Sequence, residues 1–231
     1  MTVLSVAQKV ALKIGLDSPT MLIGATDREL EELAEVISNA AEVITEAFDW
    51  QALRRVKTFT GDAIAESFTL PSDYDRMLKK SRIWSSRWRW AMTQITNSDE
   101  WLEAEIYPYV NISGIWTIFG DAFQIKPIMA TGETAKFFYI TNETVVAEDA
   151  SLHDAFSADT DRFVLSEKLL RLCAIYLWKQ AKGLDFAAEL ADYEQLAAQL
   201  MDKDGGAKPT VSGNLVAWPA SSNVWPGSVT G

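Results

Sequence analysis

TDRELEELAEVISNAAEVITEAF, residues 26–48, repeats apolar side chains every three or four positions. That period matches one face of an α-helix, and the glutamates between them fall on the opposite face. At its start, Thr26 to Glu29 matches a capping box, in which Thr26 accepts from the Glu29 amide and Glu29 reaches back. The stretch predicts a long helix whose buried stripe consists of Leu30, Leu33, Val36, Ile37, Ala40, Ala41, Ile44 and Phe48.

Three further segments show helical spacing. One covers residues 3–14 and stops at Gly15. Another covers residues 165–183 and carries Cys173 on its apolar face, which predicts a small buried side chain. The last begins at Asp185, a favourable N-cap, and continues to Gly205-Gly206. Since these segments come from both ends of the chain, they predict one helical bundle built from both ends.

The middle of the chain, from about Val56 to Ile140, alternates apolar and polar residues between glycines and prolines. This pattern predicts an antiparallel β region, interrupted by a short helix near residues 98–106. The predicted fold class is α+β: a helical bundle formed by N- and C-terminal helices, an inserted antiparallel β domain and an extended C-terminal tail. We expect four parts: N-terminal helices of the bundle (1–55), the inserted β domain (56–147), an acidic loop with the C-terminal helices (148–204) and a docking tail (205–231).

Composition excludes several classes of function. The chain has 231 residues, of which 48% are hydrophobic and 23% charged, as in a globular protein with a sizeable core. Because no run approaches the roughly 20 apolar residues that span a bilayer, we expect no membrane partner. The first residues lack the features of a secretory signal, which indicates synthesis in a cytoplasm. With one cysteine and one histidine, disulfides and Cys/His zinc sites are excluded.

Enzyme chemistry finds little support in the remaining residues. The acidic segment from Glu148 to Asp161 lacks the spacing of an EF-hand and offers no recognisable acid–base pair. We interpret it as a solvated loop that ends by capping the next helix. His153 lies in this polar segment and is expected to be exposed without a partner. We therefore predict a protein that is not an enzyme, with no catalytic residues, no metal and no cofactor.

The stretch RMLKKSRIWSSRWRW, residues 76–90, interleaves cations with tryptophans, and no acidic residue lies between Asp75 and Asp99. Plain sheet packing would place its arginines outward and its tryptophans, Trp88 and Trp90, inward. A contact between subunits would also favour arginine and tryptophan. A platform for single-stranded nucleic acid is the third interpretation, although the net charge of -11 argues against a protein that grips phosphates. The candidate interface residues are Arg82, Trp84, Arg87, Trp88 and Arg89.

The segment NLVAWPASSNVWPG, residues 214–227, has no charged side chain and carries two Trp-Pro pairs. Burying one tryptophan contributes on the order of 4 to 6 kcal/mol, while ordering each backbone residue costs about 1 to 2 kcal/mol. Two tryptophans alone therefore do not order the tail. Docking needs backbone pairing with a partner, the lower chain entropy that Pro209, Pro219 and Pro226 give, or many tails acting together. We predict that it docks on a partner protein, the alternative being a disordered tail. The candidate partner-binding residues are Trp218, Pro219, Val224, Trp225 and Pro226.

Several segments along the chain resemble the head-to-tail adaptor proteins of short-tailed bacteriophages, the group that includes tail tubular protein A and related head-completion proteins. None of the segments is a catalytic signature. They are IGL (14–16), FDWQAL (48–53), FTLPSDYDRM (68–77), FSADTD (156–161), LWKQAKGLDFAAELADYEQ (177–195) and DGG (204–206).

The resemblance implies a virion protein that assembles as a ring of twelve beneath the dodecameric portal, extends the DNA channel and joins it to the tail. Its implied partners are the portal protein, copies of itself and the next tail component, a nozzle or tail tube. The resemblance also implies that the C-terminal tail binds the portal or a neighbouring subunit. Double-stranded DNA would pass without specific binding, because an acidic channel wall repels it. The alternative functions are a nucleic-acid-binding module that uses residues 76–90 and, with the least support, a hydrolase.

Overall fold

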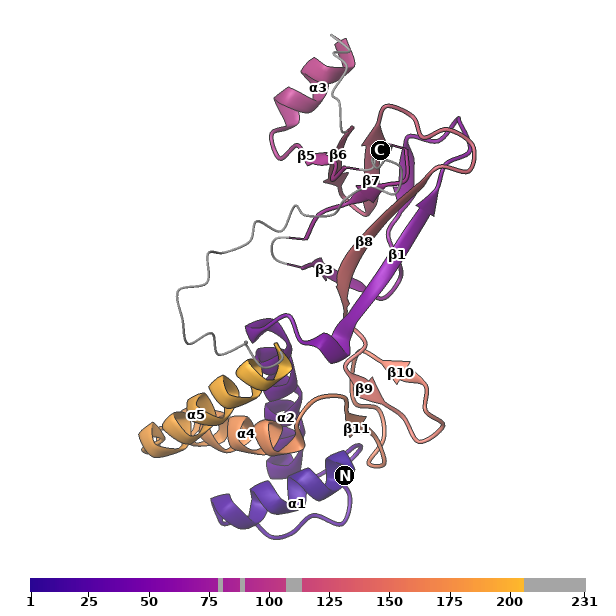
Figure 1. The fold of residues 1–231 in the computed structure, drawn as a ribbon. Coiled ribbons are helices and arrows are strands. Elements are labelled where there is room, and N and C mark those ends of the chain that lie inside the picture. Colours follow the sequence, from indigo (N-terminus) through magenta and orange to yellow (C-terminus); the bar gives the residue numbers. More distant parts are fainter. Residues whose placement is uncertain (79–80, 88–89, 107–113, 206–231) are drawn as a thin grey trace, which may run out of the picture.

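The computed structural model describes residues 1–78, 81–87, 90–106 and 114–205. Its fold is α+β, as predicted, with α1 to α5, a short 3-10 helix and three β-sheets in this part of the chain. Figure 1 shows α1, α2, α4 and α5 at one end of an elongated molecule and the larger sheets with α3 at the other. We call the four helices the helical body, and β1 to β8 with α3 the β region.

Each helix of the helical body begins at a capping residue or next to one. In α1 (Val3–Ile14) the Thr2 side chain accepts from the Ser5 amide, and Gly15 ends the helix with a positive φ. Helix α2 covers Arg28–Ala47, and its N-cap is Asp27, not Thr26 as predicted. The Asp27 carboxylate accepts from the Glu29 amide at 3.0 Å, which corrects the predicted capping box.

The C-terminal helices follow the same rule. Helix α4 (Glu167–Ala181) begins after Ser166, whose hydroxyl accepts from the Leu169 amide. The sequence had suggested that the acidic loop caps this helix. The cap is instead Ser166, which follows the loop. Helix α5 (Ala187–Asp204) starts after Phe186, and Asp185 still accepts from the Ala187 amide at 3.1 Å.

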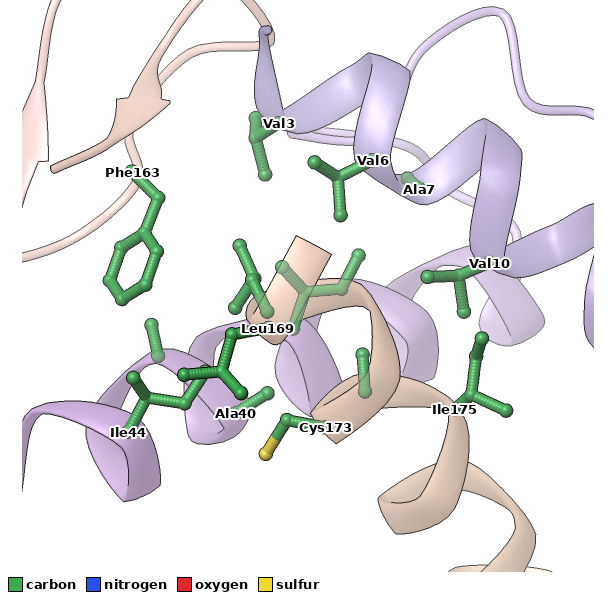
Figure 2. Close-up of a cluster of buried hydrophobic side chains, with 14 of the residues drawn as sticks. Val3, Val6, Ala7, Val10, Ala40, Ile44, Phe163, Leu169, Cys173 and Ile175 are labelled. Carbon is green, nitrogen blue, oxygen red and sulfur yellow. The ribbon is translucent and has the colours of Figure 1, made fainter. Parts of the chain in front are cut away.

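The core of the helical body centres on α4, which packs against α1, α2 and α5. Figure 2 shows Val6 and Val10 of α1, Ile44 of α2 and Leu169 of α4 directed into the same space. Cys173 is fully buried there, as predicted, and burial raises the pKa of its thiol to about 12. Burial therefore favours the neutral thiol, which packs as a small apolar side chain.

The β region contains two four-stranded sheets. In the first, β1 (Arg54–Thr60) pairs antiparallel over its whole length with β8 (Thr134–Thr141), and β8 also pairs with β3 (Tyr74–Met77) and β4 (Trp84–Ser85). In the second, the order is β2 (Ser67–Thr69), β7 (Ala122–Lys126), β6 (Ile115–Phe119) and β5 (Thr93–Gln94). The predicted antiparallel pairing holds except between β5 and β6, which are parallel.

Stacked aromatic side chains form a separate core in the β region. The Phe59 and Phe137 rings of the first sheet lie 5.2 and 5.5 Å from Phe123 of the second, and Trp116 lies 5.2 Å from the same ring. The predicted short helix is present as α3 (Ser98–Ile106). Its Trp101 is buried in a small cluster with Ile95 and Ile115.

A third sheet lies beside the helical body and was not predicted. It consists of β9 (Val145–Val146) between β10 (Leu152–His153) and β11 (Arg162–Phe163). Two of these strands lie in or next to the segment expected to be a solvated loop. The small sheet carries the chain back from β8 into α4, and Phe163 enters the core of the helical body (Figure 2).

Candidate functional site

Arg76, the first cation of the basic stretch, is used inside the fold. From β3 its Nη2 donates to the carbonyls of Thr45 and Phe48 at 3.0 and 3.2 Å and lies 3.4 Å from Asp49 Oδ1. Its Nη1 lies 2.5 Å from Asp75 Oδ2. Helix α2 has no basic residue in its last turn, so Arg76 supplies the positive charge that its carbonyl end favours. Arg76 thus joins the β region to the helical body.

Arg82 and Trp84 do point into solvent. The two side chains are exposed, whereas Ile83 and Ser85 are buried, which is the alternation of a strand over residues 82–85. Trp84 is 55% exposed on β4. These two candidate interface residues are therefore accessible to a partner.

The predicted alternation does not continue beyond β4. Trp90, expected to point inward, is 68% exposed, because β4 ends at Ser85 and the chain turns before it reaches this residue. Trp88 and Arg89 lie outside the described residues, so their predicted orientations and roles stay predictions.

Arg87 lies next to a buried carboxylate. Its Nη1 is 3.9 Å from Glu133 Oε2, and its backbone amide donates to Ser85 Oγ. Glu133 also accepts from the Ser85 hydroxyl and from the Ala130 amide, at 2.8 and 2.9 Å. These bonds connect the turn before β8 to β4. The backbone amide of Arg87, a predicted interface residue, therefore contributes to the fold.

One face of the first sheet is left open to solvent. Val56 of β1 lies directly opposite Phe138 of β8, and Thr58, Lys136 and Trp84 form the next row across β1, β8 and β4. Opposed residues of an antiparallel pair share a face, and so do residues two apart on one strand, so all five side chains project from the same face. Their exposed state is consistent with this. We call these five residues the outer sheet face.

The sequence interpretation missed Val56, Lys136 and Phe138. A signal for one of them was present in KFFYI, where Phe137 and Phe138 are consecutive in a predicted strand. Consecutive strand residues point to opposite faces, so both faces of this strand carry a phenylalanine. Phe137 is buried in the aromatic core, and Phe138 is 50% exposed.

A cavity lies where α2 meets the end of β8. It has a volume of about 310 Å³. Its walls include the carboxylates of Glu42 and Glu46 from α2, Asp75 from β3 and Asp154 from the loop after β10. Ala41, Val145 and Phe156 give it an apolar side. We call this cavity the α2–β8 cleft.

The acidic loop is not simply solvated. Asp159 accepts from the backbone amides of Leu22 and Ile23 at 2.8 to 3.2 Å. Asp161 is buried, and its burial favours a raised pKa, but the amides of Ser157 and Ala158 hold that pKa below its usual range. Asp159 therefore fastens the loop to the segment after α1, and Asp161 holds a turn within the loop.

His153 has a partner, contrary to the prediction. Its Nε2 lies 2.8 Å from Ser151 Oγ, and the same hydroxyl contacts Asp149 Oδ1 at 2.6 Å. In a nucleophilic triad the histidine lies between the carboxylate and the hydroxyl. Here the carboxylate binds the hydroxyl itself, so the arrangement is that of a hydrogen-bonded turn.

Other features of the described residues concern ligands and membranes. Across residues 1–78, 81–87, 90–106 and 114–205, no three Asp, Glu, His or Cys side chains are grouped so that they could hold a metal ion. No helix in the same ranges is both long and apolar enough to cross a bilayer. The candidate tail residues Trp218, Pro219, Val224, Trp225 and Pro226 lie outside the described part.

The SU10 adaptor protein family model matches residues 1–215 of the chain. The matched range includes every residue that the structure describes and ends before both Trp-Pro pairs of the tail. No curated protein matches the sequence.

Proposed function

Because the chain belongs to the SU10 adaptor protein family, a family of phage head-to-tail adaptors, we propose that it forms a ring beneath the portal of a virion. The match over residues 1–215 is the observation that carries this proposal. A structural adaptor of a phage is a virion component, and its role is not enzymatic. In the proposed ring, twelve copies extend the DNA channel and join it to the next tail component.

The proposed division of the chain follows its hydrophobic cores. The helices of residues 1–55 and 148–204 share one cluster of buried side chains, and most of residues 56–147 surround others. We propose that the helices form the bundle, that the strands form a β domain inserted into it, and that residues 205–231 form a docking tail. Two cores in one chain suit an adaptor, since each can face a different component.

The net charge of -11 supports a channel that does not bind DNA. A negative wall repels the phosphate backbone, so DNA passes without adhering. The nucleic-acid-binding alternative has less support, because Arg76 is held by α2 and Arg87 lies near Glu133. A gel-shift series distinguishes the two: steeply salt-dependent binding that Arg87→Ala with Arg89→Ala removes would favour the alternative.

Counting the copies tests the ring directly. The full chain is mixed with the portal of the same phage, and the mass of the complex is measured. We expect twelve copies on each portal, held by one repeated contact between two different patches. One or two copies per portal would contradict the ring.

The tail is proposed to anchor the ring on the portal or on a neighbouring copy. Deletion of residues 207–231 should leave the helical body folded and weaken portal attachment. Trp218→Ala with Trp225→Ala should lose part of that binding, because buried indoles are frequent anchors of interfaces. Leu12→Ala serves as a control, with one exposed apolar side chain removed from α1. Attachment that survives the deletion unchanged would show that the tail is not an anchor.

A further inference from the structure

Two surface features take no part in the fold described above: the outer sheet face and the α2–β8 cleft. On the outer sheet face, Val56 is 56% exposed, Trp84 55% and Phe138 50%. Single exposed apolar residues are normal on a protein surface. Three large ones in adjacent rows of one sheet form a patch, and such patches mark interfaces.

The outer sheet face is also positively charged. Lys136 lies between Trp84 and Thr58 in one row, next to Phe138 along β8. In the described part of the chain no carboxylate pairs with Lys136. A cation beside exposed aromatic rings is typical of the centre of a protein interface.

The α2–β8 cleft has the opposite character. Four carboxylates line it, and among the described residues only Asp75 has a cationic partner, which is Arg76. Glu42, Glu46 and Asp154 therefore stand beside one cavity without a positive charge of their own. Its apolar side, formed by Ala41, Val145 and Phe156, offers a surface on which aromatic rings can pack.

The two features lie on different faces of the molecule. Phe138 belongs to the outer sheet face, and Thr141 of the same strand lines the cleft. Residues three positions apart on a strand point to opposite faces. Two complementary patches on opposite faces allow a head-to-tail contact that repeats from copy to copy, whereas a two-fold dimer brings the same patch together.

We propose that the outer sheet face of one copy docks against the α2–β8 cleft of the next copy. Trp84 and Phe138 cover the apolar side of the cleft, and Lys136 faces the carboxylates of Glu42 and Glu46. This contact rests on the proposed ring, for which it supplies the interface between subunits. It also accounts for the exposed Trp84 in an otherwise acidic protein.

A photo-crosslinking amino acid at position 138 tests the contact, both in the portal complex and in the free chain at high concentration. We expect adducts between copies that map to residues 38–46 or 141–156. The same probe at Leu12, which is 81% exposed on α1, is the control and should not react with these segments. Adducts to the portal, to other segments, or no adduct at all would overturn the contact.

Charge exchange provides a second readout. Lys136→Glu should weaken association between copies by about tenfold or more, and adding Glu42→Lys with Glu46→Lys should restore it. Lys168→Glu changes another exposed lysine, on α4, and should have no effect. A complete ring with Lys136→Glu would overturn this interface and leave the proposed function standing. Adducts between copies, found without twelve copies on the portal, would support this interface and contradict the proposed ring.

Discussion

The helical body and the β region differ in how completely their apolar side chains are buried. In the helical body α4 is covered by α1, α2 and α5, and Leu169, Leu170 and Cys173 are almost wholly inaccessible. In the β region, the described residues cover one face of the first sheet, with the aromatic side chains of the second. Its other face leaves Val56, Trp84 and Phe138 in water. The helical body buries its apolar residues within one chain, whereas the β region leaves large apolar side chains exposed.

The joint between the two regions is built from polar groups. Arg76 binds the end of α2, and the Trp50 indole donates to the Ile44 carbonyl at 2.8 Å. Two of the segments that resemble phage adaptors, FDWQAL and FTLPSDYDRM, lie here. These motifs therefore supply contacts between the β region and the end of α2.

The largest effect is expected in the core of the helical body. Leu169→Ala removes a fully buried side chain and should lower the free energy of unfolding by about 2 to 5 kcal/mol. Chemical denaturation followed by far-UV circular dichroism measures this. Leu12→Ala, at an exposed position of α1, should change the same quantity by less than about 0.5 kcal/mol. Equal losses for the two variants would contradict the assigned core.

The next effect concerns the joint. Arg76→Met keeps a long side chain but removes its hydrogen bonds to the end of α2, at an expected cost of about 2 kcal/mol. Arg54→Met is the matched control, because Arg54 is exposed and makes one bond of 3.3 Å to the Asp49 carbonyl. Hydrogen exchange should show faster opening where β3 meets α2 in the Arg76 variant only.

A smaller effect depends on pH. The folded-state pKa of Asp161 is lowered, so its carboxylate stabilises the fold above the unfolded-state pKa of about 4, and this contribution is lost as pH falls through the folded value. Asp161→Asn should cost about 1 kcal/mol at neutral pH and less in acid, where the two curves converge. Denaturation from neutral to acidic pH checks this, with the exposed Asp121→Asn as control. Parallel curves would refute the assigned role.

The smallest effect is expected on the outer sheet face. Phe138→Ala should cost the isolated chain less than about 1 kcal/mol, since it loses only part of a cross-strand pair with Val56. Phe137→Ala, one residue earlier, should cost about 3 to 5 kcal/mol because its ring is buried against Phe123. Thermal unfolding of both variants gives the comparison. Similar losses would mean that both faces of β8 are covered within one chain.

Much of the fold could be predicted because its signals are local. Helical spacing located α1, α2, α4 and α5 and placed Cys173 in the core. The predicted N-cap of α2 was wrong by one residue, because Thr26 and Asp27 are both residue types that cap helices well. The loop that leads into α2 is restrained by a residue distant in the sequence, since Asp159 accepts from the Leu22 and Ile23 amides.

The candidate site could be predicted only in part. Arg82 and Trp84 are exposed as an interface requires, whereas Arg76 and Arg87 contact groups that the chain brings from elsewhere. The strands of the third sheet have two residues each, too short to leave a periodic signal. His153 was expected to have no partner, although Ser151, whose hydroxyl lies 2.8 Å from its Nε2, is only two positions away in the sequence.

The sequence by itself determined the helices, their apolar faces and the α+β class, because a helix or strand period is a property of neighbouring residues. It also carried the segments typical of the adaptor family. Only the tertiary structure decided which cations remain available and which face of β8 stays open. Those outcomes depend on the register between β1, β4 and β8, whose residues lie far apart along the chain and meet only when it folds.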